Sequence, residues 1–179
     1  MPSRSSASYG AHRPPARAAA GALGLLALVA VTSGCAKDEF PDRTAVVKLG
    51  GSSQTYEVDS CGLDGQTVFV VARAPDGAVL QGVLGLRKDD ATGILRSTGM
   101  TVDLDPASDS TRLAAFGKES WKRRGSTGPA PGQITSARLR GSRIQIAGDA
   151  VPVDPDDVAV PRAKAERFSI DARCDEVED

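Results

Sequence analysis

Apolar and polar residues alternate with a period of two along much of the chain after residue 43. The pattern is clearest in residues 54–59 (QTYEVD), 134–139 (ITSARL), 143–147 (RIQIA) and 166–174 (ERFSIDARC). A period of two places every second side chain on the same face, as in a strand with one buried side. We therefore predict strands in these four segments.

Turn residues between apolar segments predict hairpins. Residues 44–49 (TAVVKL) and 54–59 are separated by the glycine- and serine-containing turn 50–53, and the strongly β-branched segment 66–74 (QTVFVVARA) is joined by Pro75-Asp76-Gly77 to residues 78–86. Proline presets φ at such a turn, and glycine accepts a positive φ. Both pairs of segments are therefore expected to form antiparallel hairpins.

The middle of the chain is less regular. Residues 94–104 predict one or two short strands, residues 111–116 predict a strand or a helical turn, and residues 119–133, rich in Gly, Pro, Ser and basic residues, are the least ordered by pattern. No segment has helical periodicity over three turns. The expected fold is mainly β, a single-domain antiparallel β-sandwich or open barrel. Because aromatic residues make up only 4% of the chain, its core must consist mainly of Val, Ile and Leu.

The N-terminal region has the pattern of an export signal. Its first 17 residues contain three arginines and no acid, and residues 18–31 are apolar, which is shorter than the roughly 20 residues of a spanning helix but suits a signal peptide. A short uncleaved membrane anchor is the alternative. The sequence Val31-Thr32-Ser33-Gly34-Cys35 resembles the lipobox of bacterial lipoproteins, although Thr32 stands where the motif usually has Leu or Val. The resemblance implies cleavage between Gly34 and Cys35 and a lipid on Cys35.

This interpretation divides the chain into a signal peptide (1–34), a lipidated tether (35–43), a β-rich ectodomain (44–174) and an acidic tail (175–179). The expected location is the cell membrane, with the ectodomain outside the cytoplasm. The tether reaches at most about 30 Å, because an extended chain spans at most about 3.6 Å per residue. Loss of the signal leaves 19 of the 22 basic residues against 23 acidic ones, and this acidic balance argues against a nucleic-acid partner.

Two cysteines, Cys61 and Cys174, remain after Cys35 is assigned to lipid. They lie 113 positions apart, one near each end of the expected domain. In an exported protein two remaining cysteines usually form a disulfide. Two buried free thiols and pairing between molecules are the alternatives.

The order of these segments resembles that of the mycobacterial lipoprotein antigens, the LpqH-like family. Ala45-Val46-Val47 leads through Gly50-Gly51 to a strand that ends at Cys61, residues 132–150 (GQITSARLRGSRIQIAGDA) resemble the family's hairpin, and residues 168–174 (FSIDARC) resemble its closing strand. The match is poor between residues 87 and 133. The resemblance implies a β-rich ectodomain, a lipid anchor and a disulfide between Cys61 and Cys174. It implies no catalytic residue, and members of this family are known as exposed envelope antigens.

Motifs of common catalytic and nucleotide-binding sites are absent from the sequence. It contains no G-x-S-x-G, S-x-x-K, C-x-x-C, Walker A or G-x-G-x-x-G motif, and its single histidine, His12, lies in the signal. Two acidic clusters lack the spacing of a calcium loop and are interpreted as solvated loops: Asp103, Asp105 and Asp109, and Asp154, Asp156 and Asp157. We therefore expect no enzymatic activity, no cofactor and no metal.

Trp121-Lys122-Arg123-Arg124 is the one candidate surface contact in the sequence. The only tryptophan stands beside three cations, an arrangement suited to binding lipid headgroups or envelope glycans, although a tryptophan packed at the edge of the core is the simpler interpretation.

The favoured function is a non-catalytic interaction or structural ectodomain. The alternative is a carrier of lipid or another apolar ligand, supported by Gly82 and Gly85, which would open a sheet. An enlarged internal cavity, lined by Val and Leu and open at one end, would favour the carrier, whereas a filled core with an exposed patch near Trp121 would favour the interaction module.

Overall fold

The computed structural model describes residues 43–87, 90–107 and 112–174. This part of the chain consists almost entirely of strands, with one 3-10 helix and one short α-helix. The strands are β1 (Thr44–Leu49), β2 (Ser52–Asp64), β3 (Thr67–Arg73), β4 (Val79–Arg87), β5 (Asp90–Gly93), β6 (Gly99–Asp103), β7 (Arg112–Phe116), β8 (Gln133–Arg140), β9 (Arg143–Val153) and β10 (Glu166–Arg173). The helices are η1 (Leu95–Ser97) and α1 (Lys118–Arg123). The signal peptide, the lipidation site at Cys35 and the acidic tail lie outside the described residues.

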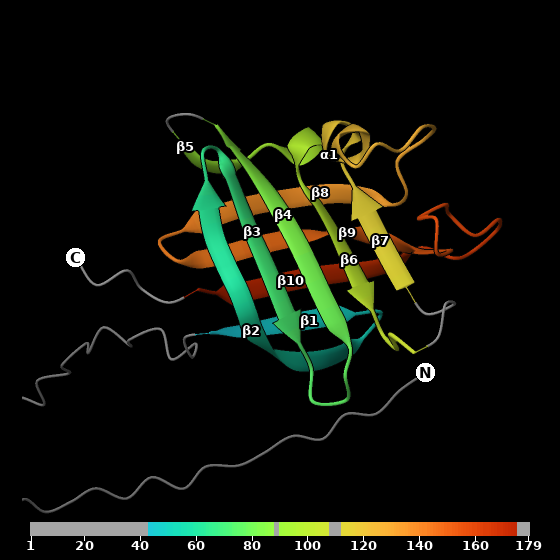
Figure 1. Cartoon of the computed structure of the whole chain (residues 1–179), viewed down its shortest axis with the longest axis horizontal. Coiled ribbons are helices and arrows are strands. Elements are labelled where there is room, and N and C mark those ends of the chain that lie inside the picture. Colours follow the sequence, from blue (N-terminus) through green and yellow to red (C-terminus); the bar gives the residue numbers. More distant parts are fainter. Residues whose placement is uncertain (1–42, 88–89, 108–111, 175–179) are drawn as a thin grey trace, which may run out of the picture. The chain divides into compact units, whose positions relative to one another are not determined.

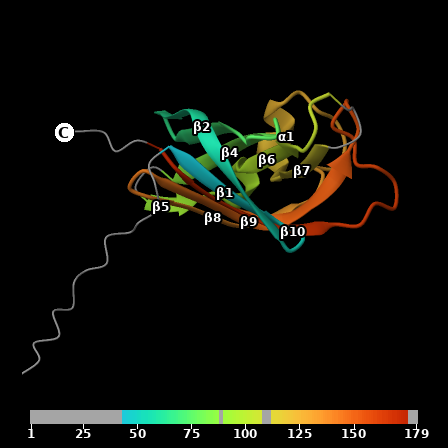
Figure 2. The same ribbon diagram turned by 90° about the horizontal axis from the view of Figure 1, so that it is seen from below.

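Eight of the strands close an antiparallel barrel. The circuit runs β1-β2-β3-β4-β6-β7-β9-β10 and returns to β1 through six residue pairs between β1 and β10. The short β5 and the longer β8 form an additional connection between β4 and β9. Figure 1 shows that β8, β9 and β10 cross the direction of β3, β4 and β6, and Figure 2 shows these two groups as opposite walls. The prediction of an antiparallel β fold is therefore confirmed, in its barrel form.

The alternating sequence pattern places one side of each long strand in the barrel interior. In β10, Phe168, Ile170 and Ala172 are buried, whereas the residues between them are half-buried. The largest side chains that are almost completely buried come from five different strands and are Tyr56, Phe168, Leu80, Leu84, Met100, Ile144, Ile146 and Ile170. The core thus consists chiefly of aliphatic residues, as the low aromatic content predicts.

The predicted turn at Pro75-Asp76-Gly77 forms and joins β3 to β4. Gly77 has a φ of +95°, a conformation that other residues rarely adopt. A carboxylate oxygen of Asp76 accepts a hydrogen bond from the backbone N–H of Ala78 at 3.1 Å, and this bond is the main cause of the lowered pKa of Asp76. Asp76 and Gly77 therefore form this turn in the way that their residue types predict.

Glycines in β4 allow close packing and do not open the sheet. Pairing with β3 continues without a shift from Val79 to Gly85. A Cβ at Gly82 would lie 2.9 Å from a methyl group of Val70, and one at Gly85 would lie 2.4 Å from the Cβ of Ser97. The suggestion that these glycines open the sheet is wrong, because neighbouring side chains occupy the space that their missing side chains leave.

The middle of the chain contains more order than its pattern indicates. Residues 94–104 form η1 and β6, residues 112–116 form strand β7, and the segment predicted to be least ordered begins with α1. Glu119 of α1 pairs with Arg96 at 2.7 Å and accepts a hydrogen bond from the Ser97 hydroxyl at 2.6 Å. Tertiary contacts to η1, which no periodic pattern records, thus hold this short helix in place.

All described residues belong to one of the two units into which the chain divides, Asp38–Asp179. The main core cluster lies between Ala45 and Ala172, and its disulfide joins residues within the same unit. A unit with its own core and crosslink can fold by itself. Segment 38–179 is therefore suitable for measurement alone.

Candidate functional site

A change of partner along β2 leaves a gap in the barrel wall. Residues Ser52–Glu57 of β2 pair with β1, whereas Glu57–Asp64 pair with β3, and the register shifts between Val58 and Ser60. The first residue of β1, Thr44, pairs with Glu57, so the pairing between β1 and β2 ends at Glu57. Beyond this point β2 continues without β1 beside it.

An open pocket of about 1050 Å³ lies at this gap. Its walls come from the second half of β2, the start of β3, the β8–β9 turn and the end of β10. The floor is apolar, because Val58 and Val68 are 2% and 4% exposed and belong to the barrel core. Leu139 adds a half-buried side chain, and Leu63, 63% exposed, lies at the edge. This volume is slightly above the roughly 300–1,000 Å³ typical of small-molecule pockets.

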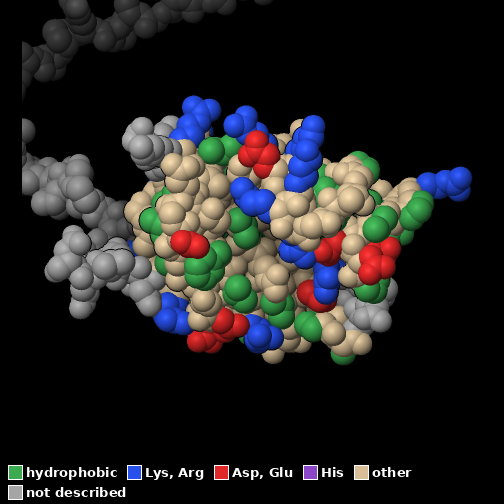
Figure 3. All heavy atoms as spheres, turned by 45° about the horizontal axis from the view of Figure 1, so that its top comes forward, with side chains coloured by type: hydrophobic (Ala, Val, Ile, Leu, Met, Phe, Trp, Pro, Cys, Tyr) green, Lys and Arg blue, Asp and Glu red, His purple; other side chains and the backbone are tan. Residues whose placement is uncertain are grey.

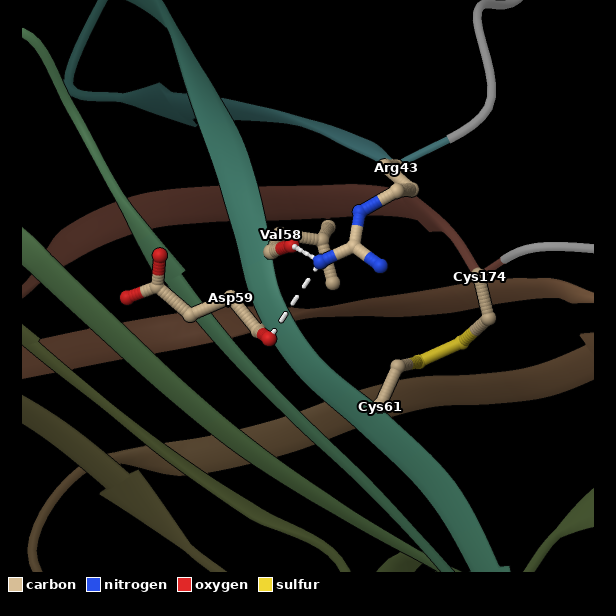
Figure 4. Close-up of a disulfide and its surroundings, with 5 residues drawn as sticks. All are labelled: Arg43, Val58, Asp59, Cys61 and Cys174. Atoms are coloured by element: carbon tan, nitrogen blue, oxygen red, sulfur yellow. Dashed lines mark hydrogen bonds between the residues drawn. A yellow bond between two sulfur atoms is a disulfide. The ribbon is translucent and has the colours of Figure 1, made fainter.

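The disulfide between Cys61 and Cys174 joins two walls of the pocket. Cys61 lies on β2 and Cys174 directly follows β10, with their Cα atoms 5.7 Å apart (Figure 4). The backbone N–H of Cys174 also donates a hydrogen bond to the carbonyl of Ser142 in the β8–β9 turn, at 3.0 Å. The predicted pairing is confirmed, and its position links three separate segments around one opening.

Arg43 ties the start of the domain to β2 beside the disulfide (Figure 4). Its guanidinium donates hydrogen bonds to the backbone carbonyls of Val58 at 2.8 Å and Asp59 at 3.4 Å. The backbone N–H of Val58 in turn donates to the carbonyl of Arg43 at 2.8 Å. The point at which the chain enters the barrel is therefore part of the pocket.

Arginines make the polar part of the pocket cationic. Four of them line it, together with a single carboxylate, and these residues are Arg43, Arg140, Arg143, Arg173 and Asp59. Asp59 itself forms an ion pair with Arg73 at 3.4 Å. The opening therefore combines an aliphatic floor with an excess of positive charge.

Arg143 is held by a carboxylate on the outer face of the barrel. Two of its nitrogens each lie 2.6 Å from an oxygen of Asp171, and Gln145 donates to the same carboxylate at 3.1 Å. Burial alone would raise the pKa of Asp171, but the bonds from Arg143 and Gln145 and the charge of Lys48 together lower it. This bidentate pair fixes the β9 side of the opening.

The environment of Trp121 contradicts its interpretation as a surface ring. The side chain is only 4% exposed and packs on Phe116, with ring centroids 5.3 Å apart. Arg124 lies 5.1 Å from the centre of the Phe116 ring and pairs with Asp157 at 2.6 Å. The simpler interpretation of Trp121, a ring packed at the edge of the core, therefore holds, and the alternative of a surface contact by the ring does not, because the ring fills a small second core beneath α1.

The cations beside Trp121 do lie on the surface. Lys122 and Arg123 are exposed, and Arg123 also donates a hydrogen bond to the carbonyl of Ser97 at 2.8 Å. Figure 3 shows Lys and Arg side chains around an acidic side chain on the face that carries α1.

The acidic clusters are parts of turns and ion pairs where the structure describes them. Asp154 accepts hydrogen bonds from the backbone N–H groups of Asp156 and Val158, and the mostly buried Asp157 pairs with Arg112 and Arg124. Asp109 lies outside the described residues. In the described ranges no three His, Cys, Asp or Glu side chains are grouped as they would be around a metal ion.

Comparisons with known proteins leave the family of this chain open. No protein-family model matches the sequence, and no curated protein matches it either. Among the described residues, no helix has the length and apolar character needed to span a membrane.

The sequence interpretation identified the cysteines but not the pocket between them. Leu63, Leu139, Arg140 and Arg173 had no role in it, because each stands in an ordinary strand or turn pattern. The predicted disulfide could have indicated the site, since a bond between Cys61 and Cys174 brings their neighbours together from opposite ends of the domain.

Proposed function

We propose that this protein is a membrane-anchored lipoprotein of the cell envelope whose non-catalytic barrel binds the apolar part of an amphiphile. The observation that carries the proposal is the pocket of about 1050 Å³, with an aliphatic floor and a charged edge. An apolar tail lying over Val58 and Val68 would be removed from water, at roughly 25 cal/mol for each Å² buried. This proposal takes up the carrier hypothesis, because Val58, Leu63, Val68 and Leu139 give the pocket an apolar part, whereas Trp121 is buried.

The sequence supports the anchored part of the proposal. Lipid on Cys35 would place the membrane at most about 30 Å of extended chain from Arg43, which lines the pocket. The resemblance to the mycobacterial lipoprotein antigens points to the same location. In this arrangement the pocket is within reach of membrane lipid.

Fatty-acid labelling tests the anchor. The full chain expressed in an actinobacterial host should incorporate an alkyne-tagged fatty acid and fractionate with membranes. The Cys35→Ser chain should do neither. Equal labelling of both chains would refute an anchor at Cys35.

Ligand binding is tested on segment 38–179 with a neutral naphthylamine probe that becomes fluorescent in apolar surroundings. We expect saturable binding and displacement by monolauroylglycerol, an uncharged single-chain amphiphile. Ser142→Trp places a large ring at the pocket, which Ser142 lines, and should weaken binding at least tenfold. Ser53→Trp is the matched control, because Ser53 is an exposed residue of the β1–β2 hairpin outside the pocket. Binding that is absent, or equally strong in both variants, would refute the pocket as the site.

A further inference from the structure

We infer that the acidic segment 175–179 of this chain docks on the arginines of the pocket and competes there with the charged part of an anionic ligand. The inference rests on the proposed function and adds how the same site is regulated. Four of the five residues in this segment (DEVED) are acidic. No other part of the proposed function uses it.

The attachment point of this segment lies at the opening of the pocket. Segment 175–179 follows Cys174 directly, and Cys174 lines the pocket. The disulfide holds the Cα atom of Cys174 5.7 Å from that of Cys61 on β2, and the backbone N–H of Cys174 donates a hydrogen bond to the carbonyl of Ser142 at 3.0 Å (Figure 4). The segment is therefore joined to a residue that is fixed to two different walls of the pocket.

The pocket arginines lie close to the same attachment point. Arg173 precedes Cys174, and Arg140 and Arg143 flank the turn to which Cys174 is hydrogen-bonded. Arg43 donates a hydrogen bond to the backbone of β2 three residues before the other cysteine of the disulfide. Three residues of a strand span about 10 Å, whereas five extended residues span at most about 18 Å. The segment is therefore long enough to bring carboxylates to the arginines on both sides of the opening.

Charge complementarity favours this occupant. Besides its four arginines the pocket has one carboxylate, Asp59, which pairs with Arg73 at 3.4 Å. Arg143 also binds Asp171, outside the pocket. A guanidinium offers several N–H donors, so an arginine can bind a further carboxylate beside the partners that it already has. The acidic residues of segment 175–179 supply negative charge where the pocket lining has little.

The covalent connection favours this segment over a soluble anion. A segment joined to its site by a short stretch of chain is present there at an effective concentration in the millimolar range. Each exposed ion pair contributes little, but several of them act together in one segment. An anionic head group must displace these carboxylates, whereas an uncharged head group need not. The docked segment thus lowers the affinity of the pocket for anionic amphiphiles.

Replacement of the acidic residues by their amides tests this competition in oxidised segment 38–179. The amide variant keeps the length of the chain and combines four changes, Asp175→Asn, Glu176→Gln, Glu178→Gln and Asp179→Asn. It should bind laurate, whose head group is a carboxylate, about fivefold more tightly than the parent does, the factor that corresponds to a few exposed ion pairs. Its affinity for monolauroylglycerol should stay unchanged. The gain should shrink at high salt, because the opening borders solvent.

An arginine variant distinguishes docking from general repulsion between acidic groups. In the background Arg140→Gln/Arg173→Gln, the amide changes should no longer affect the affinity for laurate, since contacts that depend on each other are not additive. Arg138→Gln/Arg167→Gln is the matched control, because these exposed arginines lie on the same two strands, β8 and β10, but do not line the pocket. In the control background the fivefold gain should remain.

NMR relaxation locates the segment without any ligand. Backbone order parameters of residues 175–179 in the parent should exceed about 0.6, the value below which a backbone is flexible on the picosecond-to-nanosecond timescale. They should fall below this value in the amide variant and in Arg140→Gln/Arg173→Gln, and stay above it in the control variant. This readout does not depend on whether an amphiphile binds.

The outcomes separate this inference from the proposed function. Order parameters that are low in the parent, or that are equal in the parent and in Arg140→Gln/Arg173→Gln, would overturn docking on the arginines. An equal gain in laurate affinity in both arginine backgrounds would indicate general repulsion and overturn competition at the pocket. Order parameters that depend on Arg140 and Arg173 would support docking even if no amphiphile bound, and that second result would refute the proposed function alone.

Discussion

The disulfide offers the most direct test of how this barrel is held together. Cys61 and Cys174 close a loop of 113 residues, and the chain-entropy relation gives about 16 cal/mol/K for such a loop, or about 5 kcal/mol at 25 °C. Native disulfides in small exported domains contribute about 2–5 kcal/mol when measured. We therefore expect the Cys61→Ser/Cys174→Ser variant of segment 38–179 to lose 2–5 kcal/mol, on the same scale.

Thermal and urea unfolding provide the assay. Near the midpoint, unfolding entropy is about 2.1 cal/mol/K per residue, so a domain of roughly 130 residues should lose about 4 °C for each kcal/mol. The expected decrease in Tm is thus about 7–18 °C, from the same relation and the 2–5 kcal/mol range. The urea m-value should increase as well, because an unfolded chain without the crosslink is more expanded and exposes more surface.

Reduction of the parent protein is the internal control. Segment 38–179 contains only these two cysteines, so dithiothreitol should lower the Tm of the parent and leave that of the double variant unchanged. A loss of less than about 1 kcal/mol would fall outside the range for a crosslink of this length and refute the entropic reasoning. A large loss with an unchanged m-value would show that the bond acts through contacts of the folded state.

Three further measurements test the core, the outer face and the second cluster. Leu80→Ala removes a fully buried side chain from the barrel and should cost about 2–5 kcal/mol in urea unfolding, and a loss below 1 kcal/mol would contradict its place in a close-packed core. Asp171 has a lowered pKa when folded, so its charged form stabilises the fold above the unfolded value of about 3.9, and this contribution disappears as the pH falls through the folded pKa. The stability difference between the parent and Asp171→Asn should therefore shrink as the pH falls below about 4, and a pH-independent difference would refute the role of the carboxylate. Trp121 should emit at short wavelength, resist quenching by acrylamide and ignore added vesicles, whereas a vesicle-dependent spectrum would restore it as a membrane contact.

The strands were predictable because the signals that define them are local. Alternation in residues 166–174 predicts β10 within one residue, and Pro75-Asp76-Gly77 predicts the turn that the structure contains. Each depends on a few neighbouring residues and on the period of a strand. The pairing of Cys61 with Cys174 was predicted from the number of cysteines and the expectation of an oxidising location, not from any contact.

The pocket and α1 were not predictable in this way because they depend on distant residues. β2 leaves β1 and continues along β3 at a register shift near Val58, a change that no pattern within residues 54–59 records. In α1 the six residues KESWKR are too few for helical periodicity, and the helix is fixed by the burial of Trp121 on Phe116 and by the pair between Arg124 and Asp157. Local sequence patterns thus predicted the strands, whereas the candidate site depends on how distant strands are placed relative to one another.

The position of the pocket connects the two halves of the proposed function. The chain enters the described domain at Arg43, which lines the pocket, whereas the β1–β2 hairpin lies at the far end of a six-residue strand. With the proposed lipid on Cys35, a tether of at most about 30 Å would hold the pocket end of the barrel closer to the membrane than the opposite end. Under that proposal, a site beside Arg43 would lie nearer to lipid head groups than a site at the opposite end. The disulfide lies at the same place, because it joins the end of β10 to β2. With the proposed anchor, the opening and the crosslink would both lie at the end of the barrel nearest the membrane, and this position would favour a lipid of the membrane over a soluble molecule as the ligand.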